Sequence, residues 1–358
     1  MGGIWMTRHR FASAASEFVG QKAGVVLSEQ EMARLLPEEM AQEIFPADDQ
    51  LVRLRSEEYE ELAVHLLYEV GNIPSPDTAP AQVRLFHQSK NRPAMVRMLI
   101  NVWKLLISFA HGTPEQEPDA DGLMALTIPC PSELIASKFF SKKHRRDEFF
   151  SLVEDRYKQP GREVAHELIE GLRLDIHKDP FIGYRRIEWK NEVELRELFH
   201  SESLDAMHGH FIDQRFIDYL NRHFEDIDKM NWRKFEGLVC EFFERSGYVV
   251  QIGEGRADGG VDARVWAKDK DTSLSPTILV QCKRQKEKVE QVVVKALWAD
   301  VHAEGAESGL IATTSALEPG ARKVIEARGY PVFESNRNEV RRWIEALRTP
   351  ENGVFMGY

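Results

Sequence analysis

The spacing of apolar residues changes near residue 230, and this change restricts the possible folds more than any other feature of the sequence. Residues 231–246 carry apolar side chains at helical spacing. Residues 248–252 are then predicted as a strand, and segments 261–267 and 277–283 alternate apolar and polar residues, as strands with one buried face do. Further helices are predicted at 289–303, 318–328 and 336–347, and further strands at 308–314 and 330–333. This order predicts a mixed α/β domain in which helices flank one sheet.

The first two hundred residues show mostly the helical period. The expected helices are 29–44, 56–70, 95–110, 132–157 and 162–178. A short strand and a charged helix are expected within 179–200, and an amphipathic helix at 211–225. We therefore predict four parts: a mostly α-helical domain over 1–205, a linker helix over 206–229, the α/β domain over 230–348 and a tail over 349–358.

The composition excludes several classes of protein. Hydrophobic residues make up 42% of the 358 residues and charged residues 29%, which is typical of a globular chain and not of a disordered or fibrous one. The most apolar helical run, 95–109, is interrupted by Arg97, Asn101 and Lys104, so we expect no membrane-spanning segment and no membrane partner. The first residues lack the apolar core of a signal peptide.

Cysteine content and charge further restrict the class of protein. Cys130, Cys240 and Cys282 are few and scattered, which indicates reduced thiols, a cytoplasmic location and no cysteine-based metal site. The formal net charge is −11, but residues 231–348 hold 19 Lys and Arg against 18 Asp and Glu. The overall acidity therefore does not exclude nucleic-acid binding by this region.

Three polar residues lie where the predicted strands meet. Asp262 follows the glycine pair 259–260, and Gln281 and Lys283 lie two positions apart at the end of the next strand. Residues i and i+2 of a strand face the same side, so Gln281 and Lys283 should point together while the residue between them points into the core. If the two strands pair across the turn 268–276, Asp262 comes close to both.

This trio is suited to metal-assisted hydrolysis of a phosphodiester. A hard divalent cation prefers oxygen ligands, and the Asp262 carboxylate and the Gln281 amide oxygen would supply two. Such a cation activates water, and Lys283 would orient that water and stabilise charge at phosphorus. Glu236, at the edge of the apolar stripe of the preceding helix, is expected to reach the same cation.

Four segments, in this order and spacing, resemble a known family. They are FEGLVCEFFERSGYVV, RADGGVDARV, ILVQCKR and GLIATTSALEPGARKVIEARG. Together they are similar to the Mrr-type restriction endonuclease catalytic domain. That domain belongs to the PD-(D/E)XK nuclease superfamily, in the branch with Gln in place of the second acid. The resemblance covers about residues 228–335.

The resemblance implies a restriction-endonuclease-like fold and an endonuclease of the restriction or defence type that hydrolyses DNA with Mg²⁺ or Mn²⁺. Carried over by position, Asp262 is the metal-binding aspartate, Gln281 replaces the second acid, Lys283 is the catalytic lysine and Glu236 is the glutamate of the first helix. Because Gln281 is neutral, metal binding should be weaker and Glu236 more important. Asp258 also falls on a motif position, and we assign it to loop shaping.

The basic residues after the active strand suggest how the substrate is held. Arg284, Lys286 and Lys288 are expected to contact the backbone of double-stranded DNA, and a solvated turn is the alternative. A double-strand cut needs two active sites, so a homodimer or higher oligomer is expected.

Two other functions stay open: a catalytically silent DNA-binding or sensing module, and a nuclease of DNA repair. The N-terminal region matches no family, and its acidity favours protein contact over DNA contact. One group of residues, the Asp/His cluster (Asp205, His208, His210 and Asp213), has the side chains of a metal site. For so short a pattern a structural role is the better expectation.

Overall fold

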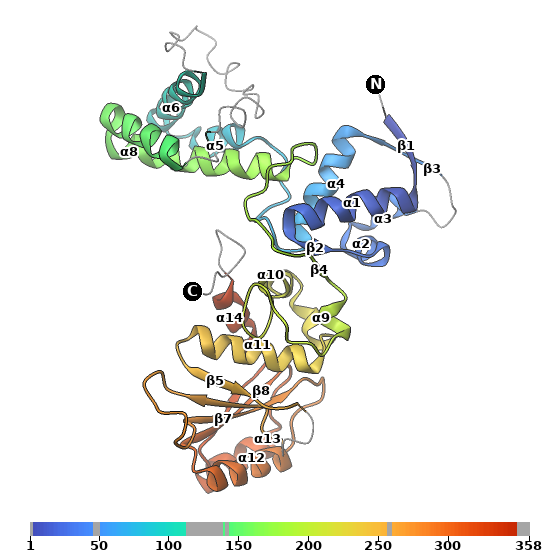
Figure 1. Cartoon of the computed structure of the whole chain (residues 1–358), viewed down its shortest axis with the longest axis vertical. Coiled ribbons are helices and arrows are strands. Elements are labelled where there is room, and N and C mark those ends of the chain that lie inside the picture. Colours follow the sequence, from blue (N-terminus) through green and yellow to red (C-terminus); the bar gives the residue numbers. More distant parts are fainter. Residues whose placement is uncertain (1–2, 46–50, 112–138, 140–142, 256–259, 349–358) are drawn as a thin grey trace. The chain divides into compact units, whose positions relative to one another are not determined.

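The computed structural model of the protein describes residues 3–45, 51–111, 139, 143–255 and 260–348. The chain forms two compact units (Figure 1). The described residues of 1–6, 51–65 and 75–188 form the first unit, and those of 7–50, 66–74 and 189–348 form the second. The domain boundaries predicted at 205 and 229 stay a prediction.

A five-stranded mixed sheet organises the C-terminal part of the second unit. Its strands are β5 (Val249–Ile252), β6 (Ala263–Trp266), β7 (Ile278–Lys283), β8 (Ser308–Thr313) and β9 (Val332–Ser335), in that spatial order. β5, β6 and β7 pair antiparallel, as the predicted hairpin requires, whereas β7, β8 and β9 pair parallel. Parallel neighbours need crossover connections, which helices provide here.

Helices cover both faces of this sheet. α12 (Gln291–Glu304) and α13 (Pro319–Arg328) form the crossovers on one face, and α11 (Trp232–Arg245) lies on the other (Figure 1). α14 (Arg337–Leu347) contacts α11, β8 and β9. Gly309 permits the close approach of α12 to β8, because a Cβ there would lie 2.9 Å from the Leu297 side chain. This arrangement confirms the predicted α/β fold with flanking helices.

The remainder of the second unit is built from short elements around α1 (Arg8–Ala23) and α10 (Gln214–Arg222). The other elements are β2 (Val25–Val26), α2 (Glu29–Leu35), α3 (Glu38–Ile44), β4 (Val193–Glu194), α9 (Glu197–His200) and η2 (Phe224–Asp228). The helix predicted over 29–44 is therefore wrong as one element. Pro37 separates α2 from α3, because proline has no N–H to donate within a helix.

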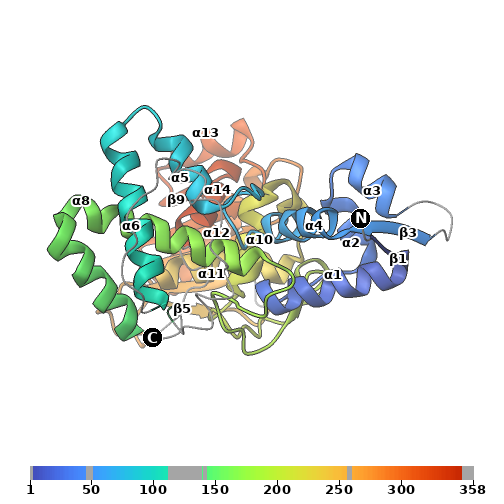
Figure 2. The same ribbon diagram turned by 90° about the horizontal axis from the view of Figure 1, so that it is seen from above.

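The first unit is mostly helical, as predicted, but it also contains a two-stranded sheet. β1 (Gly3–Thr7) pairs with β3 (Leu51–Arg55), and α4 (Ser56–Glu69) follows. α5 (Ala81–Ser89), α6 (Pro93–His111) and α8 (Lys143–Lys178) lie side by side (Figures 1 and 2). α8 joins two of the predicted helices through a kink at Lys158 (φ 60°), near Pro160. Residues 132–138 and 140–142 of the first of these lie outside the described residues.

α6 is more apolar than expected from the polar residues that interrupt it. Its residues Pro93–Ala110 have a mean hydropathy of 1.3, so by length and composition this helix could cross a membrane. Five of its apolar side chains nevertheless belong to a buried core that includes Phe139, Phe149 and side chains of α8. The packing of this face is that of a core helix.

The buried Asp218 of α10 predicts a specific pH dependence of stability. Burial raises its pKa to about 8, although Gln214 Nε2 donates a hydrogen bond to Oδ1 (3.0 Å). An unfolded aspartate titrates near pH 4, so between about pH 4 and 8 only the folded chain holds this proton. The free energy of unfolding then falls as the pH rises, by about 1.4 kcal/mol per pH unit.

Asp218→Asn should remove this dependence, because the amide is neutral at every pH and its oxygen can still accept from Gln214. We expect similar stabilities near pH 4 and a more stable variant near pH 8, measured by urea unfolding. A difference between the two proteins that does not change with pH would contradict this prediction.

Candidate active site

Asp262 lies directly before β6 and against β7. Its backbone N–H donates to the Val280 carbonyl oxygen (2.9 Å), and its carboxylate Oδ2 accepts from the backbone N–H of Cys282 (2.6 Å). The two contacts flank Gln281. The pairing of β6 with β7 therefore holds the carboxylate beside the strand that carries the other predicted site residues.

Gln281 is also buried at this place, with an exposed fraction of 6%. Its Nε2 faces Gly260, where a Cβ would lie only 3.1 Å away and where φ is +94°. Glycine adopts this backbone conformation readily and leaves the room that the amide needs. Asp262, Gln281 and Gly260 therefore lie beside one another, and the catalytic role of Asp262 and Gln281 stays a prediction. Asp258, assigned to loop shaping, lies outside the described residues.

Glu236 on α11 meets Asp262 in the interior. The two residues are 5% and 9% exposed, and their side chains share a hydrogen bond. Burial, and then the charge of Asp262, raise the pKa of Glu236 to about 8. Two carboxyl groups this close cannot both ionise easily, so one keeps a proton at neutral pH. Glu236 therefore contacts Asp262 directly, and its expected role as a ligand of the same cation stays a prediction.

Arg233, one turn before Glu236 on the same helix, was not among the predicted site residues. Its guanidinium NH1 donates to Glu236 Oε2 (2.6 Å), and NH2 donates to the carbonyl oxygen of Gly253 (2.6 Å). The i, i+3 spacing of Arg233 and Glu236 was visible in the sequence. Nothing in the sequence indicated the contact with Gly253, because that residue lies beyond the next strand.

Lys283 ends β7, opposite Thr313 of β8, and its side chain is half-buried. Three hydroxyl groups at the end of β8 hold the chain that leaves β7. Thr313 donates to the Lys283 carbonyl oxygen (2.7 Å), Thr314 to that of Gln285 (3.0 Å) and Ser315 to that of Glu287 (2.7 Å). These hydroxyls therefore fix the path of residues 283–287 and with it the position of Lys283.

Of the three residues predicted to contact DNA, one is hydrogen-bonded within the protein and two are exposed. Arg284 NH1 donates to the backbone carbonyl oxygen of Asp228 in η2 (2.8 Å), which ties β7 to the segment before α11. Lys286 and Lys288 are exposed on the segment that follows. Their position permits phosphate contacts, whereas Arg284 is engaged within the protein.

The two described cysteines are free thiols, as predicted, and both lie close to the site. Burial raises the pKa of Cys240 and of Cys282, and the nearby carboxyl groups of Glu236 and Asp262 raise both further. A thiol in such surroundings stays protonated and is a poor nucleophile. Neither cysteine is therefore suited to covalent catalysis.

The Asp/His cluster of residues 205–213 has structural partners. Asp213 pairs with Arg215 Nε (2.7 Å) and caps α10, while His210 pairs with Glu244. In the part of the chain that the structure describes, no group of three or more His, Cys, Asp and Glu side chains is placed to hold a metal ion. The expected structural role of the cluster agrees with these contacts.

The side chains around Asp262 do fit a divalent cation when the amide is included. Among the described residues, no donor reaches the buried Gln281 Oε1. An unsatisfied buried acceptor costs about 1–3 kcal/mol. The Cys282 N–H holds the Asp262 carboxylate against the same strand, and the carboxyl groups of Asp262 and Glu236 disfavour each other's charge. A divalent cation held by Asp262, Gln281 and Glu236 would satisfy the amide oxygen and replace the shared proton.

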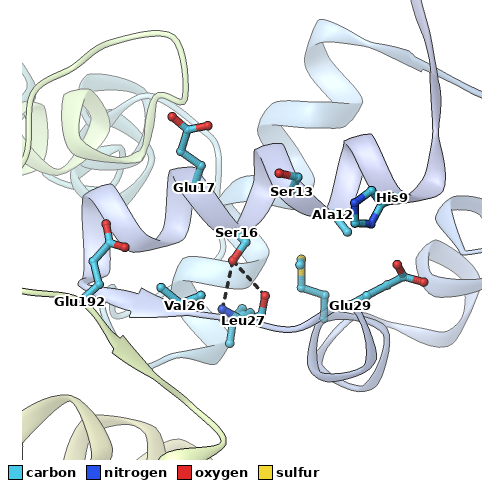
Figure 3. Close-up of a pocket in the computed structure, with 10 residues that line it drawn as sticks. His9, Ala12, Ser13, Ser16, Glu17, Val26, Leu27, Glu29 and Glu192 are labelled. Carbon is cyan, nitrogen blue, oxygen red and sulfur yellow. Dashed lines mark hydrogen bonds between the residues drawn. The ribbon is translucent and has the colours of Figure 1, made fainter.

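A separate cavity of about 400 Å³ lies between α1, β2 and α2 (Figure 3). His9, Ser13 and Glu17 line it from α1, and none of the predicted site residues contributes. The Ser16 hydroxyl in its wall donates to the Leu27 carbonyl oxygen (2.9 Å) and accepts from the Leu27 N–H (3.2 Å). This hydroxyl is thus already satisfied by the backbone.

Comparison with known proteins agrees with the geometry. Residues 227–344 match the family model Mrr_cat, described as a restriction endonuclease, which confirms the resemblance found in the sequence. A similar solved structure is that of "MspJI Restriction Endonuclease in Complex with 27-mer Oligonucleotide", at 18% identity and a TM-score of 0.26. The match covers 54% of this chain and 40% of that one. No curated protein matches the sequence.

The two buried carboxyl groups disfavour each other's charge. A variant that lacks one of them should therefore be more stable, although it loses a ligand of the cation site. Asp262→Asn removes one of the two carboxyl groups, and the amide oxygen can still accept from the Cys282 N–H. In EDTA we expect the variant to be about 1–2 kcal/mol more stable than wild type, measured by thermal unfolding. Added Mg²⁺ or Mn²⁺ should stabilise wild type only.

A matched control is Asp226→Asn. Asp226 is equally buried, but Arg34 NH1 (2.9 Å) and Lys229 Nζ (2.7 Å) compensate its charge. The same substitution should therefore lower stability there. Destabilisation of both variants in EDTA would show that the Asp262 and Glu236 carboxyl groups do not destabilise the wild-type protein.

Proposed function

We propose that this protein is a divalent-metal-dependent endonuclease that hydrolyses phosphodiester bonds of double-stranded DNA, of the restriction or defence type. The observation that supports this most is the contact of Glu236 with Asp262, beside the strand that carries the unsatisfied Gln281 oxygen, within a region that matches a restriction endonuclease family. Mg²⁺ or Mn²⁺ is the proposed cofactor.

Each residue has a definite task in this proposal. Asp262, Gln281 and Glu236 hold the cation, which when bound lowers the pKa of water and offsets negative charge on the phosphate. Lys283, placed at the end of β7 by the Thr313 hydroxyl, orients the attacking water and stabilises charge on the phosphoryl oxygens. The burial of the carboxyl groups strengthens these electrostatic interactions.

Substrate binding is assigned to the segment after β7. Lys286 and Lys288 project from a backbone that the hydroxyls of Thr314 and Ser315 hold in place. Such a pair would contact phosphates without reading the base sequence. We further propose that two copies act together on the two strands, since one site cuts one strand.

Cleavage of supercoiled plasmid DNA tests the proposal. Wild type should convert the plasmid to nicked and linear forms with Mg²⁺ or Mn²⁺ and not with EDTA. Lys283→Ala and Asp262→Ala should each lower the rate at least about 100-fold. Plasmids with and without methylated bases would show whether modification directs cleavage.

Lys295→Ala is the control, because Lys295 is an exposed lysine on α12 of the same domain. It should cleave like wild type. Equal rates in wild type, Lys283→Ala and Asp262→Ala would contradict the assignment. Salt-dependent DNA binding without cleavage under any divalent metal would favour a silent binding module instead.

The two exposed lysines predict a change in the salt dependence of DNA binding. Replacing Lys286 and Lys288 together by Ala should remove about two phosphate contacts. The slope of log K against log salt, measured by fluorescence anisotropy, should then become shallower by about 2.

Arg284→Ala provides the contrast, because its guanidinium is engaged with the Asp228 carbonyl oxygen. We expect this variant to lower thermal stability and to leave the slope unchanged. A double lysine variant with the slope of wild type would place the phosphate contacts elsewhere.

A further inference from the structure

We infer that Arg233 is the positioning residue of the cation site: it holds Glu236 in the orientation that faces Asp262. This inference rests on the proposed function, because it concerns how the same site is assembled. Arg233 would orient one of the cation's ligands without binding the cation itself.

The first observation is the pair of hydrogen bonds made by the guanidinium. NH1 donates to Glu236 Oε2 and NH2 to the Gly253 carbonyl oxygen, both at 2.6 Å. The arginine side chain is only 13% exposed and that of Glu236 only 6%. A planar guanidinium with two engaged nitrogens has little freedom to move, so it also fixes the carboxyl group that it contacts.

The second observation is that the same guanidinium reaches the chain that leads to Asp262. The Gly253 N–H donates to the Asp262 carbonyl oxygen (2.8 Å), so Gly253 contacts both Arg233 and Asp262 through its backbone. At Gly255, where φ is +89°, a Cβ would lie 3.0 Å from Arg233 NH1. The glycine therefore leaves the space that the guanidinium occupies.

These contacts link the helix of Glu236 to the strand start that carries Asp262. With one Glu236 oxygen held by Arg233, the carboxyl group is oriented and its hydrogen bond to Asp262 is retained. Residues that orient metal ligands in this way typically change metal affinity 10–100-fold when they are lost. Arg233 should therefore affect how tightly the cation binds.

Direct titration of the full chain with Mn²⁺ in the absence of DNA tests this inference. Arg233→Met keeps the length of the side chain but removes both donors. Its Kd for Mn²⁺, from isothermal calorimetry or electron paramagnetic resonance, should be 10–100-fold higher than that of wild type. Arg233→Lys should lie between the two, because one ammonium replaces the planar pair of donors.

The cleavage assay adds a second readout. The Mn²⁺ concentration for half-maximal cleavage by Arg233→Met should shift upward by the same factor, while the rate at saturating Mn²⁺ stays within several-fold of wild type. A merely structural role would lower the amount of active protein and leave the Mn²⁺ dependence unchanged.

Arg245→Met is the matched control on the same helix. Arg245 Nε donates to Glu241 Oε1 (2.7 Å) in a similarly buried pair that does not touch Glu236 or Asp262. It should lower thermal stability without a change in Mn²⁺ affinity. Unchanged affinity in Arg233→Met, or an equal loss in both methionine variants, would overturn the inference. A wild-type chain that neither binds Mn²⁺ nor cleaves DNA would instead overturn the proposed function.

Discussion

The hydrogen bond from the Cys282 backbone to the Asp262 carboxylate is the contact on which the candidate site depends. It joins a residue before β6 to the strand that carries Gln281 and Lys283. Because the donor belongs to the sheet backbone, the position of the carboxylate follows from strand pairing and not from the rotamer of a flexible partner. Glu236 then reaches the same carboxylate from α11. Arg233 and Gly253 connect the helix to the same place.

The site concentrates groups that would destabilise an ordinary protein interior. Two buried carboxyl groups disfavour each other's charge, and a buried amide oxygen has no donor among the described residues. Such unsatisfied groups persist where function requires them, since their cost is offset by packing elsewhere. Here that packing is the apolar core between the sheet and α12 and α13, which includes Leu279, Leu297 and Ile311. The hydroxyl groups of Thr313, Thr314 and Ser315 add backbone contacts directly beside the site.

The C-terminal domain was predictable because its local patterns and its tertiary contacts agree. Strands β6, β7 and β8 alternate or are continuously apolar, and their predicted ends lie within about two residues of those observed. The N-terminal region was less predictable. α1 was missed, although Phe11, Ala15 and Val19 form a buried stripe, and the pairing of β1 with β3 joins segments far apart in the chain. Short two-stranded pairings leave little periodic signal in the sequence.

The amino-acid order alone was sufficient for the α/β class, for the polar residues at the strand ends and for the family resemblance, because period, spacing and residue type are all local properties. Three features depended on the folded chain: the contact that raises the pKa of Glu236 beside Asp262, the hydrogen bond from Arg233 to Gly253, and the hydrogen bond from Arg284 to Asp228. Each joins residues that different elements carry, and burial changes their chemistry. Distance and desolvation arise only when the elements pack together, and no local pattern encodes them.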